Sequence, residues 1–393
     1  MVTGEAKTLE KAAKGVLCLG FIQDADADPA LLEIPEETAR LVASGAAGAI
    51  LFKRNIRSPF QTAQLNRKLK DLAGERPFLL AVDQEGGRVA RLRGAPYAEV
   101  PSMRRLGETG GEALAFQAGQ ALAASVRRVG FDVDFAPVMD VDTNPLNPVI
   151  GDRSFGRDPE LVGRMGVALA RGLEAGGVAS CAKHFPGHGD TSQDSHLTLP
   201  RLPHSMERLR QMELLPFARY AGAGLASVMS AHVVFEALDP GSPATFSRRI
   251  QTDLLRGEVG FRGLLICDDL EMNAVAEHWG IGEAAVLSVK AGVDLLLICH
   301  SAERQNEAVE ALAAAASSDS AFRDRLLDAA ARVGAFARKW SRRMDDAALS
   351  ALKAEEARGH APFVCPALDA LNAPSGLETA KADPTEAARW KKA

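Results

Sequence analysis

Eight short apolar runs recur along the chain, and they limit its possible folds more than any other feature. The runs do not alternate apolar with polar residues, as a strand with one solvated face would. Strands that are apolar on both sides belong to a sheet covered on both faces, which means parallel strands joined by crossover helices. The runs are VLCLGFI (16–22), AGAILF (47–52), PFLLAVD (77–83), DVDFAPV (132–138), VASCAKH (178–184), ASVMSAH (226–232), GLLICDD (263–269) and DLLLICH (294–300).

Segments with helical periodicity fill the gaps between these runs. One segment has well-marked ends: Asp158 is a suitable N-cap before Pro159, and Gly176-Gly177 stops the helix before the next run. Within it, leucine and methionine recur every four residues, while arginines fall on another face. Further amphipathic helices are predicted at about 60–73, 112–128, 205–221 and 302–315.

Eight strand–helix units over roughly 320 residues favour a (β/α)₈ TIM-like barrel, although an open doubly wound sheet is the structural alternative. No glycine-rich G-x-G-x-x-G turn follows the first run, which argues against the open sheet. Polar, reactive side chains follow most of the runs, and a barrel would gather them around one mouth. These side chains are Asp83, Lys183, His184, His232, Asp268, Asp269 and His300.

The strand–helix pattern fades after about residue 343, which divides the chain into two parts. Residues 1–343 are predicted to form one catalytic barrel domain. Residues 344–393 are rich in alanine, proline and charge, and predict a C-terminal extension: a short helix, then a partly disordered or surface-draped tail. The extension is too short to be a second catalytic domain.

The composition is that of a globular protein, and it excludes several classes of partner. The chain is 47% hydrophobic and 25% charged, with a net charge of −5 and no basic patch, so no nucleic-acid partner is expected. No stretch approaches the roughly 20 apolar residues that cross a bilayer, so no membrane association is expected. The lysines before VLCLGFI imitate a signal peptide only faintly, because the run is short and no cleavage signature follows it.

The cysteines point to a reducing compartment. Four of the five lie inside apolar runs, and none has C-x-x-C spacing, so they predict small buried side chains and a cytoplasmic location. They are Cys18, Cys181, Cys267, Cys299 and Cys365.

The stretch KHFPGHGDTSQDSHLTLP (183–200) holds three of the chain's eight histidines and allows three interpretations. A metal site is the first, but Pro and Gly between His184 and His188 make a loop, so the helical spacing of a zinc motif does not apply. A plain polar turn is the second, and it would suffice for any one of these histidines alone. A proton-transfer site is the third, because loops at the mouth of a barrel are where sites are built.

Asp194 and His196 are the residues that would transfer the proton. One residue separates them, so the carboxylate can accept a hydrogen bond from the imidazole and stabilise its protonated form. Asp268, at the end of GLLICDD, is a carboxylate that a rigid strand delivers to the same mouth, as a nucleophile requires. A role of Asp268 or Asp269 in capping the following helix is an equal alternative at this point.

Donors and acceptors for a small, hydroxyl-rich ligand are also present. AVDQEGGRVARLRG (81–94) supplies Asp83 and Arg91 with other arginines, and VIGDRSFGRDP (149–159) places Arg153 between glycine turns. Together with Lys183 and His184, they are candidates for orienting such a ligand, although each alone is an ordinary loop charge.

KHFPGHGDTSQDSH, with DQEGGRVARL, VIGDRSFG and ICDDLEM in the same order, resembles the family 3 glycoside hydrolases, in particular the bacterial β-N-acetylhexosaminidases of cell-wall recycling. The resemblance covers residues 15–300. It implies a retaining hydrolysis on a (β/α)₈ barrel, with a small carbohydrate as substrate, without metal or cofactor, in a monomer or weak homodimer. Two departures, Cys267 where Ser or Thr is frequent and a long C-terminal tail, leave the chemistry untouched.

By motif position, the resemblance makes Asp268 the nucleophile, His196 the acid/base and Asp194 its partner. Asp83, Arg91, Arg153, Lys183 and His184 become contacts to a terminal N-acetylglucosamine, and His188 and Asp190 shape the loop. A retaining glycosidase ordinarily uses two carboxyl groups about 5 Å apart, whereas this loop offers a His–Asp pair. We expect the loop, with Gly187 and Gly189 near its base, to move so that the acid enters when substrate is bound.

Three other functions remain open. The first is a family 3 enzyme of different specificity, such as a β-glucosidase or a phosphorolytic hexosaminidase. The second is a metal-dependent hydrolase on the same barrel, and the third is a catalytically silent sugar-binding barrel. The intact Asp268, Asp194 and His196 argue against the third.

Overall fold

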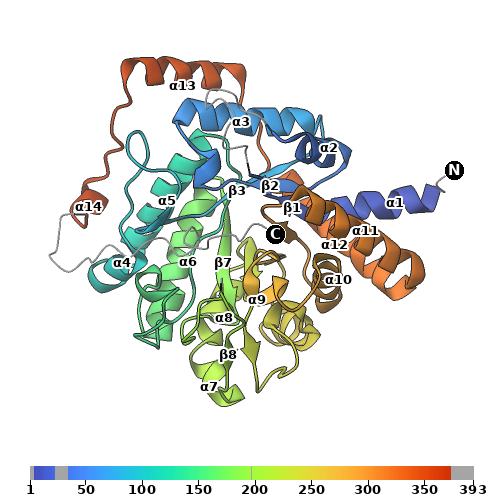
Figure 1. Cartoon of the computed structure of the whole chain (residues 1–393). Helices are drawn as coiled ribbons and strands as arrows, with labels where there is room; N and C mark the ends of the chain where they lie inside the picture. Colours follow the sequence, from blue (N-terminus) through green and yellow to red (C-terminus); the bar gives the residue numbers. More distant parts are fainter. Residues whose placement is uncertain (1–3, 23–33, 196, 373–393) are drawn as a thin grey trace.

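Seven of the eight apolar runs each contain one strand of a parallel barrel, and the run at 178–184 contains all but the last residue of its strand (Figure 1). The structure is a computed structural model that describes residues 4–22, 34–195 and 197–372. The strands are β1 (Leu17–Leu19), β2 (Gly48–Ile50), β3 (Leu79–Val82), β6 (Val133–Asp134), β7 (Ala179–Phe185), β9 (Ser227–Ser230), β11 (Leu264–Cys267) and β12 (Leu296–Ile298).

The strands follow one another around the barrel in chain order, and each pair is parallel. The last strand, β12, returns to pair with β1. Between β11 and β12 the ring closes through a parallel bridge of Ile266 with Leu295 and a hydrogen bond from the amide of Cys267 to the carbonyl of Leu295 (3.0 Å). The predicted (β/α)₈ barrel is therefore confirmed.

Most of the strands are shorter than the apolar runs that contain them. The ends of the runs leave the hydrogen-bonded ladder but stay buried, as Phe21 and Cys299 do beside β1 and β12. An apolar run reports burial, and burial at the floor and mouth of a barrel extends beyond strand pairing.

Helices surround the barrel, and the predicted segments at about 60–73, 112–128 and 302–315 are confirmed. The helices are α1 (Gly4–Lys14), α2 (Glu36–Ser44), α3 (Pro59–Leu72), α4 (Met103–Thr109), α5 (Glu112–Arg128), α6 (Pro159–Ala175), α7 (Met206–Gln211), α8 (Leu214–Gly222), α9 (Asn273–Ala276), α10 (Ile281–Ala291), α11 (Ala302–Ser318), α12 (Ser320–Trp340), α13 (Asp346–Arg358) and α14 (Pro366–Asp369). Shorter pieces are the two-stranded pairs β4 (Gln84–Gly86) with β5 (Val89–Ala90) and β8 (Arg201–Leu202) with β10 (Val234–Phe235), the 3₁₀ turns η1 (Lys53–Asn55), η2 (Gly151–Arg153) and η3 (Ala244–Phe246), and the π-helix η4 (Arg249–Glu258).

Helix α6 has the ends that its sequence predicts. The carboxylate of Asp158 accepts the backbone amide of Glu160 (3.0 Å), and Gly176 follows the last turn. Gly177 then has a φ of +78°, a left-handed conformation that glycine adopts without strain. These signals are local, which is why the sequence alone predicts them.

The single helix predicted at 205–221 is wrong, because α7 and α8 are separate helices. Pro216 lies in the first turn of α8, where a proline ring would clash with the carbonyl of residue 212 in a continuous helix. The chain therefore bends before the proline, and the buried Glu213 at the bend pairs with Arg208 (3.1 Å).

The segment after residue 343 packs on the barrel as two helices. In Figure 1, α13 runs along α3, and Asp346 of α13 pairs with Arg67 of α3 (2.9 Å). Helix α14 buries Leu368. The tail at 373–393 lies outside the described residues, so a domain boundary at 343 and a disordered tail stay predictions.

None of the helices in the described part of the chain combines the length and the apolar character that crossing a bilayer demands.

A buried ion pair ties the end of α12 to the barrel. Lys70 of α3 contacts both carboxylate oxygens of Asp132 (2.8 and 2.9 Å), and both side chains are buried. The same carboxylate accepts the amides of Leu80 (2.9 Å) and Arg342 (2.8 Å). Burial lowers the pKa of Lys70 and raises that of Asp132, so each charge depends on the other.

Replacing Asp132 by alanine should therefore destabilise the fold by roughly 3 to 5 kcal/mol, because it leaves Lys70 buried without its counter-charge. Chemical denaturation measures the loss, and Asp328→Ala, which breaks exposed ion pairs with Arg325 and Arg332, serves as a control expected to cost less than about 1 kcal/mol. Equal losses in the two variants would contradict a structural role for the buried pair.

Candidate functional site

A pocket that opens to solvent lies at the C-terminal ends of the strands, where barrel enzymes carry their sites. Six of the seven reactive side chains expected at the mouth line it: Asp83, Lys183, His184, Asp268, Asp269 and His300. The barrel therefore brings together side chains that are up to 217 positions apart in the sequence (Asp83 and His300), as their places at strand ends predict.

The seventh, His232, is buried and supports the site from behind. Its Nε2 lies 3.0 Å from the carbonyl oxygen of Asp269, and its Nδ1 lies 2.8 Å from the hydroxyl of Thr245. Burial lowers the pKa of His232. A neutral imidazole held in this way fixes the backbone next to Asp268.

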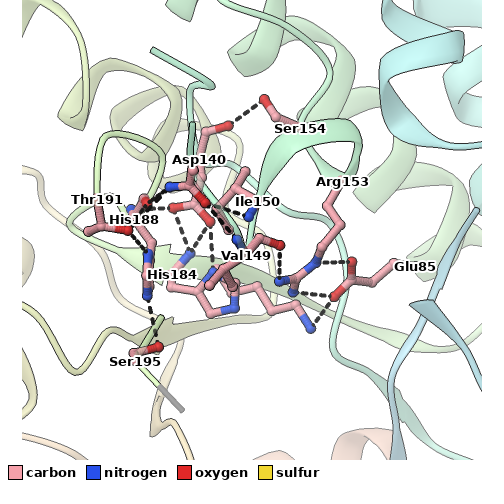
Figure 2. A network of polar contacts seen from close by, with 12 residues as sticks. Glu85, Asp140, Val149, Ile150, Arg153, Ser154, His184, His188, Thr191 and Ser195 are labelled. Atoms are coloured by element: carbon pink, nitrogen blue, oxygen red, sulfur yellow. Dashed lines mark hydrogen bonds and ion pairs between the residues drawn. The ribbon is translucent and has the colours of Figure 1, made fainter. Parts of the chain in front are cut away.

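Buried charges form one side of the pocket. Lys183 of β7 places its Nζ 2.8 Å from Asp83 and 2.7 Å from Glu85. Arg153 of η2 makes two hydrogen bonds to the carboxylate of Glu85, each 2.8 Å long (Figure 2). These two cations and two carboxylates form one cluster. The cluster joins β7, η2 and the segment that directly follows β3.

The pairing sets the protonation of the cluster. Burial raises the pKa of Glu85, but Arg153 and Lys183 outweigh it and hold that pKa well below its usual range. Burial alone would lower the pKa of Lys183 and of Arg153. The carboxylates Asp83 and Glu85 outweigh burial and hold both pKa values above their usual range. Glu85, Lys183 and Arg153 are therefore charged at neutral pH, and each is held by hydrogen bonds or ion pairs to its partners.

Arg91, predicted as a ligand contact, lies beside Asp83. Its side chain is fully buried, and its Nη2 is 3.5 Å from a carboxylate oxygen of Asp83. The backbone amide of Arg91 donates to the side chain of Gln84 (2.8 Å). In this arrangement Arg91 orients Asp83, which itself lines the pocket.

Asp140 orients His184 and is a residue that the sequence analysis missed. Its carboxylate lies 2.7 Å from Nδ1 of His184 and accepts the backbone amides of His184 and His188 (Figure 2). Burial favours protonation of Asp140, but the neighbouring His184 holds its pKa below the usual value. Nδ1 is thereby engaged, and the other edge of the ring is left for the pocket that His184 lines.

Glu85 was missed as well. It stands two residues after Asp83 in the quoted DQEGGR stretch, and Asp140 stands two residues beyond the fourth apolar run. Position near a strand end was the available signal for both, but charge pairing inside a barrel depends on neighbours from other strands.

The loop after β7 is held at its base by polar contacts. Asp190 accepts a hydrogen bond from Thr143 (2.6 Å) and lies 2.6 Å from Nε2 of His204. A Cβ on Gly189 would lie 1.8 Å from the carbonyl oxygen of Val141, so close backbone packing requires this glycine. The expected movement of the loop stays a prediction.

Of the predicted acid/base pair, Asp194 is half-buried and its carbonyl oxygen accepts the amides of Leu197 and Thr198, each at 2.9 Å. His196 lies outside the described residues. Between them in sequence, Ser195 lines the same pocket as Asp268.

Asp268 and Asp269 follow β11 and have different surroundings. Oδ1 of Asp269 accepts the amides of Glu271 (3.1 Å) and Cys299 (3.3 Å), so this carboxylate holds the turn. Asp268 accepts the amide of Asp269 (2.8 Å) and lines the pocket. Helix α9 begins only at Asn273, so neither aspartate is its cap.

One group in the described part of the chain has the spacing of metal ligands: Asp269, Glu271 and His300 place ligand atoms within 4.8 Å of one another. Charge pairing accounts for this group. Nδ1 of His300 lies 3.4 Å from each carboxylate, and although burial opposes it, Asp269 and Glu271 hold the pKa of His300 above its usual value. The loop histidines considered for a metal are engaged otherwise, His184 with Asp140 and His188 with hydroxyl groups.

A closed parallel barrel with a carboxylate and an ordered set of charged groups at its mouth defines an α/β-barrel enzyme that binds a polar small molecule.

The comparisons with known proteins identify the family. Residues 16–335 match the model of the glycosyl hydrolase family 3 N terminal domain. A "Beta-hexosaminidase" of Neisseria meningitidis serogroup C is 41% identical over 272 residues, which are 67% of this chain and 74% of the relative.

Solved structures agree. A glycoside hydrolase family 3 beta-N-acetylglucosaminidase from Paenibacillus sp. has a TM-score of 0.78 at 37% identity, over 88% of this chain and 68% of that one. A beta-N-acetylhexosaminidase from Beutenbergia cavernae has a TM-score of 0.77 at 30% identity, over 84% and 98%. This chain belongs to glycosyl hydrolase family 3 and is a glycoside hydrolase.

Replacing Glu85 by glutamine should destabilise the protein by roughly 3 kcal/mol at neutral pH, because it removes the charge between two buried cations. The pKa of Glu85 is lowered by folding, so its contribution is full above about pH 4.5 and declines as the pH falls toward 3. Chemical denaturation of wild type and variant across this range measures the difference. Glu258→Gln, in an exposed pair with Arg210, is the matched control; a deficit of Glu85→Gln that does not vary with pH would show that shape, and not charge, is responsible.

Proposed function

We propose that this protein is a retaining exo-glycosidase that removes a terminal, non-reducing, β-linked N-acetylglucosamine from peptidoglycan fragments during cell-wall recycling. Suitable substrates are N-acetylglucosaminyl-1,6-anhydro-N-acetylmuramic acid and its peptides. Family membership supports glycoside hydrolysis, and relatives named beta-hexosaminidase and beta-N-acetylglucosaminidase support the sugar. One observation carries the proposal: Asp268 lines the same pocket as Asp83, Lys183 and Arg153.

Asp268 is the nucleophile in this mechanism. Its carboxylate attacks the anomeric carbon while the bond to the leaving oxygen breaks, and a covalent glycosyl-enzyme forms. His196, paired with Asp194, gives its proton to the leaving oxygen. The neutral imidazole then takes a proton from the water that attacks the anomeric carbon, and Asp268 is released.

The charged network supplies the contacts to the sugar. Asp83, Lys183, Arg153 and His184 line the pocket and provide acceptors and donors for hydroxyl groups, while Arg91 acts by orienting Asp83. Because their mutual pairing fixes these groups before substrate arrives, little reorganisation is needed on binding.

A cellular location and a set of partners complete the proposal. All five cysteines are free thiols and four are buried, which supports a cytoplasmic location. The partner is a small carbohydrate, with no nucleic acid or membrane involved, and the protein acts as a monomer or weak homodimer. No metal or cofactor takes part, since every step uses a side chain or water.

Hydrolysis of a chromogenic N-acetyl-β-glucosaminide tests these assignments. We expect Asp268→Ala to lose activity by at least about 1,000-fold and His196→Ala to lose about 100-fold or more on a poor leaving group. An activated leaving group should spare glycosylation in His196→Ala while deglycosylation slows. Asp253→Ala, an exposed carboxylate on η4, should match wild type.

The same assay separates the alternatives. Near-normal turnover of Asp268→Ala would refute the nucleophile, and unchanged rates of His196→Ala on all leaving groups would refute the acid/base. We expect activity to survive EDTA. A loss of activity that Zn²⁺ restores would instead indicate a metal-dependent hydrolase. Acceleration by inorganic phosphate with formation of a sugar phosphate would indicate phosphorolysis.

A further inference from the structure

His188 spans the loop that carries the acid/base pair. Its Nδ1 lies 2.8 Å from the hydroxyl of Thr191, and its Nε2 lies 2.9 Å from the hydroxyl of Ser195 (Figure 2). The His188 side chain is buried, and Ser195 is 3% exposed. Ser195 is the residue between Asp194 and His196 in the sequence.

The backbone of His188 is itself held from two directions. Its backbone amide donates to the carboxylate of Asp140 (2.7 Å), and its carbonyl oxygen accepts the side-chain amide of Asn147 (2.9 Å). Asn147 also donates to the hydroxyl of Thr191 (3.2 Å). Hydrogen bonds therefore anchor the backbone of His188 at both its amide and its carbonyl group.

Ser195 has a second attachment on the side of the nucleophile. Its carbonyl oxygen accepts the amide of Ala274 (3.3 Å), in helix α9, which follows the segment bearing Asp268. Ser195 thus bridges the start of its own loop and the chain that follows β11. The hydroxyl and the carbonyl oxygen of Ser195, the residue that precedes the predicted acid/base in the sequence, are therefore both engaged.

Both ring nitrogens of His188 face hydroxyl groups, Nδ1 that of Thr191 (2.8 Å) and Nε2 that of Ser195 (2.9 Å). A neutral imidazole donates from one nitrogen and accepts at the other, and a hydroxyl can take either role, so both contacts are hydrogen bonds in either tautomer. Burial and the nearby His184 lower the pKa of His188 to about 4, so the ring is neutral and able to accept at neutral pH.

We propose that the hydrogen bond between Ser195 and His188 positions His196 for proton transfer, which makes His188 and Ser195 positioning residues of the acid/base. The inference rests on the proposed role of His196. Asp140 extends it: the same carboxylate holds the sugar-facing His184 and the amide of His188, so the substrate site and the loop share one anchor.

A series of aryl N-acetyl-β-glucosaminides with leaving groups from activated to poor tests the proposal, read as kcat/KM, which reports glycosylation. Ser195→Ala removes the hydroxyl and keeps the size. We expect activated substrates to stay within about twofold of wild type and poor ones to fall at least about tenfold, because only poor leaving groups need the proton. Ser288→Ala, which removes a buried hydroxyl bonded within α10, is the matched control and should match wild type throughout.

A double-mutant cycle checks that both residues act through one bond. His188→Ala combined with Ser195→Ala should lose no more on poor leaving groups than His188→Ala alone, and His188→Gln, which keeps a side-chain hydrogen-bonding group, should recover part of the loss. The thermal melting temperature of each variant reports its folding.

Three results would overturn the proposal: an unchanged leaving-group dependence in Ser195→Ala, a loss equal for all leaving groups, or losses that multiply in the double variant. Failure of the proposed function would look different. It would appear in the wild type, as no hydrolysis of any N-acetylglucosaminide, and would remove both proposals.

Discussion

The buried ion cluster of Lys183 with Asp83 and Glu85, extended by Arg153, is the interaction on which the mouth of the barrel depends. Charges taken out of water are stable only when they are paired and hydrogen-bonded, so the cluster exists only if β3, β7 and η2 are correctly placed. The same pairing keeps Lys183 and Arg153, which line the pocket, charged and holds them in place. Stability of the barrel top and order of the site therefore have one physical origin.

The proposed chemistry uses groups at the ends of barrel strands together with one group on a loop. Asp83, Lys183, His184 and the proposed nucleophile Asp268 lie at or just beyond strand ends, whose geometry the barrel sets. The proposed acid/base lies on a loop, where a proton donor can be brought in with the substrate. In our account the hydrogen bond between His188 and Ser195 limits the positions that this loop can take.

Sequence could predict much of this fold because its signals are local. Continuous apolar runs predict the eight strands, and Asp158 with Gly176 predicts the ends of α6. The error at 205–221 came from following amphipathic spacing past Pro216, although a proline in that position is itself a local signal. Six side chains of the pocket could be predicted from strand ends alone.

The supporting residues could not be predicted in the same way. Glu85 and Asp140 matter through partners 44 to 98 positions distant, which only the closed barrel brings near them, and their position after an apolar run was the available local signal. Arg91 shows the reverse: its residue type suggested a ligand contact, whereas burial beside Asp83 gives it an orienting position. Residue type predicts what a group can do, and packing decides what it touches.

The covalent intermediate is the most direct test of the central claim. A 5-fluoro-β-N-acetylglucosaminyl fluoride reacts readily because fluoride leaves without help, while the ring fluorine slows the hydrolysis that follows, so a glycosyl-enzyme accumulates. Proteolysis and mass spectrometry then locate the sugar. Our account predicts a single adduct on Asp268 in the peptide that contains ICDDLEM; an adduct on Asp269 or another carboxylate, or rapid turnover with none formed, would contradict it.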